Sequence, residues 1–154
     1  MTGYDWLLLG HILAAIVWVG GAITMQTVGA RLARAESAEA RAGFARTVEW
    51  IGPRLFMPSS VLVLGFGIAL VAVNEAWTIG QLWIIIGLVG IALSALGDAV
   101  FLGPQARRIG EALRTEGVES QRANALIRRL TVVGRIDSVL LVVIVADMVF
   151  KPGL

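Results

Sequence analysis

The stretch WLLLGHILAAIVWVGGAITMQT, residues 6–27, decides the fold because it is apolar over a whole membrane thickness. An α-helix needs roughly 20 apolar residues to cross the hydrocarbon core of a bilayer. The stretch therefore predicts a transmembrane helix. It also contains His11, the only histidine of the chain, so a single titratable imidazole is expected inside the membrane.

The composition of the whole chain agrees with a membrane protein. The 154 residues suffice for one domain, 57% of them are hydrophobic and only 16% are charged. Soluble domains are nearer about 45–50% apolar and about 25% charged. The absence of cysteine excludes disulfides, thiolate metal sites, iron–sulfur clusters and cysteine nucleophiles. We predict a single integral membrane domain over residues 1–154.

Three further stretches have the length and composition of membrane spans. With the first, the predicted spans are residues 6–27, 56–73, 79–102 and 131–150. The connections 28–55 and 103–130 are rich in arginine, whereas the short connection 74–78 contains no basic residue. Basic residues are retained on the cytoplasmic side. The predicted fold is therefore an all-α bundle of four transmembrane helices, with two cytoplasmic connections and both termini outside.

This charge distribution also indicates the partners of the chain. The arginines occupy segments between apolar runs, which suits the inner face of a bacterial plasma membrane better than nucleic acid. The expected partner is the lipid bilayer, and no nucleic acid is expected. The first span has no basic residue before it, unlike a cleavable signal peptide, so we expect it to stay in the mature protein.

The arginine-rich connections are predicted to be helical, because alanine, leucine, arginine and glutamate dominate them. Gly117 is expected to separate two short helices. Leu113, Leu126 and Leu130 are expected to line their apolar side. Pro104 is expected to bend or end the third span. Recurring glycine and serine in the spans favour close helix packing, which also allows a homo-oligomer or a partner within a membrane complex.

Ionisable residues inside a membrane are costly and are functional candidates for that reason. In the outer half, His11 and Asp147 are predicted to lie at similar depth, with Met148 beside Asp147. A carboxylate bonded to one ring nitrogen would fix the tautomer and leave the other nitrogen for a ligand or proton. Aromatic residues are expected to form a belt at this end: Tyr4, Trp6, Trp77 and Trp83.

A second polar layer is predicted in the inner half. It consists of Arg54, Asp98, Arg135 and Asp137. Asp98 and Arg135 lie at nearly the same depth on neighbouring helices, so they are expected to form an ion pair. Such a pair either fixes the helix register or forms the polar floor of a cavity.

One face of the first span offers room for a flat ligand. His11, Trp18 and Met25 are seven residues apart and therefore share this face, with small alanines nearby. His11 could be an axial ligand with Trp18 against the plane of the ligand. In the competing interpretation, Trp18 fills the core and His11 bonds to a backbone carbonyl.

The pattern of His11, apolar residues, an alanine and then WVGG at residues 18–21 resembles the first helix of a group of bacterial membrane proteins. The group includes the copper-resistance D family, the haem b-binding membrane protoporphyrinogen oxidase and a related family of small integral membrane proteins of unknown function. The resemblance implies four spans and a histidine that is an axial ligand or lies in a cofactor pocket. The oxidases have further histidines and a lysine within their helices, whereas this chain has neither.

Three functions follow from these patterns. The first is a haem b-binding or redox-associated membrane protein, with His11 as iron ligand, Trp18 as a wall, Asp147 behind His11 and Met148 as a possible second ligand. The second is an oligomeric transporter or channel for a small solute or ion. The third is an accessory subunit of a larger membrane complex. No hydrolytic motif is present, so the sequence does not decide whether the protein is an enzyme.

Overall fold

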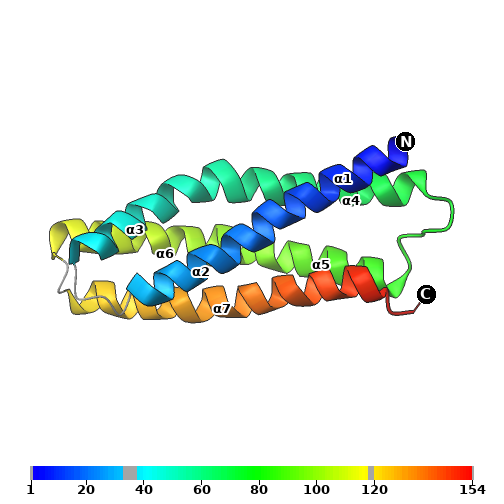
Figure 1. Ribbon diagram of the computed structural model, residues 1–154. Helices are drawn as coiled ribbons and strands as arrows, with labels where there is room; N and C mark the ends of the chain where they lie inside the picture. Colours follow the sequence, from blue (N-terminus) through cyan, green and yellow to red (C-terminus); the bar gives the residue numbers. More distant parts are fainter. Residues whose placement is uncertain (1, 33–37, 118–119, 154) are drawn as a thin grey trace.

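The computed structural model describes residues 2–32, 38–117 and 120–153, and every regular element in these ranges is helical. Within the predicted connections, residues 33–37, including Arg34, and residues 118–119 lie outside the described residues. The rest of the chain forms four long helices in sequence order (Figure 1). The prediction of an all-helical membrane-type fold is confirmed.

Each of the first three long helices consists of α-helical segments joined through one π-helical turn. The first is α1 (Gly3–Ala15), η1 (Ile16–Gly20) and α2 (Gly21–Leu32). The second is α3 (Ala38–Ile51), η2 (Gly52–Phe56) and α4 (Met57–Val73). The third is α5 (Leu82–Gly97), η3 (Asp98–Leu102) and α6 (Gly103–Thr115). The fourth long helix is α7 (Gln121–Phe150), which has no such turn.

Three of the four helices are long and apolar enough to cross a membrane. The qualifying segments are Gly3–Leu32, Arg46–Val73 and Leu82–Thr115. The fourth predicted span, 131–150, lies in α7, where Arg135, Asp137 and Asp147 interrupt the apolar sequence. Composition and length therefore establish three candidate spans in the described chain and leave the fourth as a proposal.

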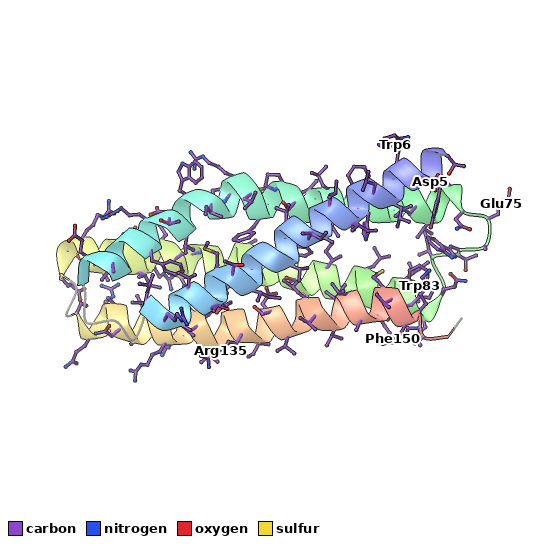
Figure 2. All side chains as sticks on the ribbon, in the orientation of Figure 1. Asp5, Trp6, Glu75, Trp83, Arg135 and Phe150 are labelled. Atoms are coloured by element: carbon purple, nitrogen blue, oxygen red, sulfur yellow. The ribbon has the colours of Figure 1, made fainter. Side chains whose placement is uncertain are left out.

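Both termini lie at the same end of the molecule, together with the turn between α4 and α5 (Figure 1). The side-chain view labels Asp5, Glu75 and Phe150 near this end (Figure 2). The long helices extend from there to the opposite end, where α3 and α6 lie.

The first long helix crosses the others diagonally (Figure 1). Its first half, α1, packs mainly on α4, whereas its second half, α2, packs on α7 and α3. The other large contacts join α5 with α7, α6 with α7 and α3 with α6. Two groups of buried side chains hold these contacts together: Trp18, Ile91 and Leu141 near the middle, and Ile109, Ala112, Leu113 and Ala123 between α6 and α7.

The helical hairpin at the arginine-rich end matches the prediction closely. Gly117 has a φ of 79°, in the left-handed region that favours glycine, and it separates α6 from α7. The Ser120 hydroxyl accepts a hydrogen bond from the Ala123 amide and donates one to Glu116 at 2.5 Å. Leu126 and Leu130 pack against the buried cluster that contains Leu113. Hydrogen bonds from Ser120 and then Arg122 lower the pKa of the exposed Glu116 carboxyl.

Pro104 does not end the third helix, contrary to the second of the two outcomes expected for it. Because proline has no amide hydrogen, it cannot donate to the carbonyl four residues earlier. The chain instead forms the π-helical turn η3, in which the Gly103 amide donates to the Asp98 carbonyl. A Cβ at Gly103 would lie 3.2 Å from that carbonyl oxygen, so glycine suits this position. The helix then continues as α6 to Thr115.

Candidate functional site

A cavity of about 650 Å³ lies between the long helices in the half of the molecule that contains α3 and α6. Apolar side chains form most of its wall, among them Trp18, Phe44, Phe56 and Leu130. The exposed residues Glu49 and Arg107 also line it. The cavity therefore reaches the protein surface at the arginine-rich end, and the exposed Met57 and Val61 of α4 also line it.

Two half-buried carboxyl groups border this cavity, in addition to the exposed Glu49. Asp98 is on η3 and Asp137 is on α7, and both side chains are half-buried. The buried Ser94 hydroxyl donates a hydrogen bond to Asp137 Oδ1 at 2.5 Å. Within the described residues, the Asp98 carboxyl has neither a hydrogen-bond donor nor a basic partner within ion-pair distance. The site thus combines an apolar wall with two acidic groups.

The predicted inner polar layer is only half assembled. Asp98 and Asp137 face one cavity, but Arg135 is exposed on α7 and the expected Asp98–Arg135 ion pair does not form. In the part of the chain that the structure describes, the single ion pair joins Arg122 and Glu116 at 3.3 Å. The reason is rotational: Arg135 and Asp137 are two residues apart on one helix and point about 200° apart around its axis.

Arg54 also lies outside the cavity. Its guanidinium is over the Trp50 ring, 5.0 Å from the ring centroid, and it donates to the Trp50 carbonyl at 3.3 Å. Both side chains are exposed. An arginine stacked on a tryptophan is an arrangement suited to the membrane–water boundary. Of the predicted inner polar layer, the two aspartates therefore border the cavity and the two arginines do not.

All three π-helical turns border the cavity. Trp18 belongs to η1, Pro53 and Phe56 belong to η2, and Asp98 belongs to η3. Turns of this kind are rare and are frequent at functional sites. The residue pattern did not predict these turns. The available signal was the glycine–proline pair that occurs twice, at residues 52–53 and 103–104.

His11 does not border the cavity, and it is bonded within the protein. Its Nδ1 lies 2.9 Å from the carbonyl oxygen of Val63 on α4. A carbonyl only accepts, so Nδ1 is the donor and Nε2 carries the lone pair. Trp18 is 3% exposed and packs with Ile91 and Leu141. The competing interpretation, a core tryptophan and a carbonyl-bonded histidine, describes both residues correctly.

Asp147 and Met148 pack on a different helix from His11. A Cβ on Gly87 of α5 would lie 3.9 Å from Asp147 Oδ2 and would collide with Met148 Cε. Asp147 is 8% exposed, and neither of its carboxyl oxygens has a hydrogen-bond partner among the described residues. The expected hydrogen bond between His11 and Asp147 therefore does not form, because His11 packs on α4 and Asp147 packs on α5.

Aromatic residues gather at the end that contains the termini, as predicted. The Trp77 ring is 5.9 Å from the Tyr4 ring and 5.2 Å from the Trp83 ring, in edge-to-face contacts. The Lys151 ammonium lies over Trp77 and Trp83, at 4.7 and 5.4 Å from the ring centroids. Trp6 is 59% exposed and lies apart from these contacts on the outer surface (Figure 2).

The four residues expected around a haem do not form one pocket. His11 contacts α4, Trp18 fills the core, and Asp147 and Met148 contact α5. Across the described ranges, no group of three or more histidine, cysteine, aspartate or glutamate side chains is arranged to hold a metal ion. The cavity described above is bordered by acids and apolar groups instead.

The long apolar helices define the chain as an integral membrane protein. Residues 6–152 match a family described as predicted integral membrane protein (DUF2269), and the chain belongs to this family. It has no match among curated protein sequences or among solved structures. None of these comparisons links it to the copper-resistance D family or to the haem-binding oxidases.

Proposed function

We propose that this protein binds a hydrophobic cation inside the membrane and transports it as a small-solute carrier. The observation that carries the proposal is a mostly apolar cavity of about 650 Å³ with Asp98 and Asp137 on its wall. Ligand pockets of roughly 300–1,000 Å³, lined by apolar groups with a few polar ones, are typical of small-molecule sites.

The charge of the site selects the ligand. A carboxylate in surroundings of low dielectric constant is costly unless an opposite charge neutralises it. No arginine or lysine of the described chain forms an ion pair with Asp98 or Asp137. A cationic ligand would supply the missing charge, while its apolar surface would contact Trp18 and Phe56.

For the membrane arrangement we propose four spans in a bacterial inner membrane, with α7 as the fourth. The charged residues Asp137 and Asp147 of α7 turn inward, toward the cavity and α5, so lipid does not meet them. The arginine-rich end would face the cytoplasm, and both termini would lie outside. The cavity would then open toward the cytoplasm. One chain forms the whole cavity, so binding itself requires no oligomer.

The test is binding of tetraphenylphosphonium, a hydrophobic monovalent cation, to the purified protein in detergent by calorimetry. We expect Asp98→Asn and Asp137→Asn each to weaken binding at least about tenfold, which corresponds to about 1.4 kcal/mol. Glu75→Gln, an exposed acid in the turn at the opposite end, is the matched control and should bind like the wild type. Equal binding by all three variants and the wild type would overturn the proposal.

A second candidate, haem binding, is favoured by the hydrogen bond of His11. With Nδ1 bonded to Val63, Nε2 is free for an iron, which is the usual arrangement of an axial histidine. The single-chain set His11, Trp18, Asp147 and Met148 does not fit, so the second ligand would come from another chain. A Soret band in the purified protein that His11→Ala abolishes would support this candidate, and a colourless protein after haem addition would refute it.

A further inference from the structure

We propose that the protein exchanges a proton for the cation: Asp98 carries a proton when the cavity is empty and releases it when the cation binds. This inference rests on the proposed function and adds proton coupling to it. The juxtaposition that carries it is two carboxyl groups on one apolar cavity, of which only Asp137 has an internal hydrogen-bond donor.

Both acids cannot be ionised at low cost in the empty cavity. Asp98 and Asp137 line the same cavity, so a negative charge on one disfavours a negative charge on the other. Apolar walls strengthen this repulsion, because the effective dielectric constant there is lower than that of water. Two carboxyl groups in such a site share one proton, with one acid ionised and the other neutral.

The hydrogen bonds decide which acid keeps the proton. The Ser94 hydroxyl, on a side chain 1% exposed, donates to Asp137 and so stabilises its ionised form. Asp98 receives no such bond from any residue that the structure describes. The proton therefore belongs on Asp98, which is also the acid held in a π-helical turn at the cavity wall.

The other charged groups around Asp98 leave this assignment intact. Of the elements packed against η3, α5 contributes no charged residue, α6 contributes Arg107 and α7 contributes Asp137. Glu49 of α3 lines the same cavity. Arg107 and Glu49 are exposed, so water and salt screen their charges at Asp98.

The exchange balances in charge and atoms. The Asp98 O–H bond breaks, the proton leaves to water at the cavity mouth, and the new carboxylate pairs with the incoming cation. One proton leaves for each monovalent cation, so the net charge of the site is unchanged. Release of the cation on the other side of the membrane, with uptake of a proton by Asp98, would couple cation movement to a proton gradient.

The experiment mixes tetraphenylphosphonium with the purified protein in weak buffer and follows released protons with a pH-indicating dye. We expect close to one proton per bound cation in the wild type, and an affinity that rises with pH by up to about tenfold per unit. Asp98→Asn should bind more weakly, release no proton and lose this pH dependence. Asp98→Glu should keep the release, and Glu75→Gln should behave like the wild type.

The outcomes separate the two proposals. A wild type that does not bind the cation overturns the proposed function and the exchange with it. Binding without proton release overturns the exchange alone. Release that persists in Asp98→Asn and disappears in Asp137→Asn overturns the assignment of the proton to Asp98.

Discussion

The outer and inner halves of the α5–α7 pair are built from similar residues but differ in how these residues face each other. In the outer half a glycine meets a large side chain: Gly87 faces Met148, and Gly90 faces Ile144. In the inner half small or short residues line the space from both helices. These residues are Ala95, Asp98 and Ala99 on one side and Gly134, Asp137 and Ser138 on the other.

The comparison shows that the number of apolar residues in a helix pair does not determine where a cavity forms between the helices. Large side chains opposite glycine interdigitate and close the outer half. Short side chains on both helices line the open space in the inner half, where Asp98 and Asp137 border the cavity. The predictions below test this difference between the halves.

The largest effect is expected from filling the outer half. Gly90→Leu places a Cβ 2.7 Å from Ile144 Cγ1, so α5 and α7 must move apart. Overpacking of this kind costs about 1–3 kcal/mol, and the branched leucine puts this variant toward the upper end. Thermal unfolding in detergent, followed by circular dichroism, measures the loss. Gly97→Leu is the control, since no atom lies within 4 Å of its Cβ position; equal destabilisation would contradict the comparison.

Filling the inner half should affect binding and leave the fold intact. Ala95→Trp adds an indole to the cavity wall, so cation affinity should fall at least about tenfold, or about 1.4 kcal/mol. The unfolding temperature should change little, because the ring enters existing space. Ala92→Trp, one turn away on the exposed face of α5, should leave affinity unchanged. Calorimetry on the purified variants distinguishes the two.

His11 tests whether the outer half acts in packing or in binding. His11→Ala removes the bond to the Val63 carbonyl and should lower the free energy of unfolding by about 1 kcal/mol. Cation affinity should not change, because His11 does not line the cavity. Ile12→Ala, on the adjacent exposed position, serves as the stability control. A loss of cation binding in His11→Ala would contradict this prediction and would mean that the outer and inner halves act as one site.

The smallest effect is expected at the α6–α7 hairpin, beyond the cavity. The Glu116 pKa is lowered in the folded protein by Ser120 and Arg122, so its stabilising contribution is present at neutral pH. That contribution is lost as the pH falls through the folded-state pKa. The protection factor of the Ala123 amide, which compares its exchange rate with that of an unstructured chain at the same pH, should therefore fall at acidic pH. Glu116→Gln should lower this protection factor at neutral pH and make it less sensitive to pH, and an unchanged dependence of protection on pH would contradict this role.

Much of this architecture could be predicted from the residue pattern. Long apolar stretches and arginine-rich connections predicted the all-helical fold and the placement of both termini at one end. Gly117 and the leucines of the hairpin were predicted correctly for local reasons, since a left-handed turn and an apolar helix face depend on neighbouring residues. The competing interpretation of Trp18 and His11 was also correct.

The candidate site was predicted less well, because it depends on helix rotation. The depth of a residue along a helix follows from counting residues. Depth alone was the basis for pairing His11 with Asp147 and Asp98 with Arg135. The direction of a side chain around the helix axis depends on how the helices pack. Because the first helix runs diagonally and α1 packs on α4, His11 contacts α4. The π-helical turns shift direction further, and no periodicity in the sequence reveals them.

These turns have a consequence for how the family can vary. Each π-helical turn holds one residue more than a regular turn, and each residue in a helix advances the side-chain direction by about 100°. Deleting a single residue within Asp98–Leu102 would restore a regular helix and rotate all of α6 relative to α5. Relatives that lack that residue would turn a different side of α6 toward the cavity, so a one-residue gap there would mark a change in what the protein binds.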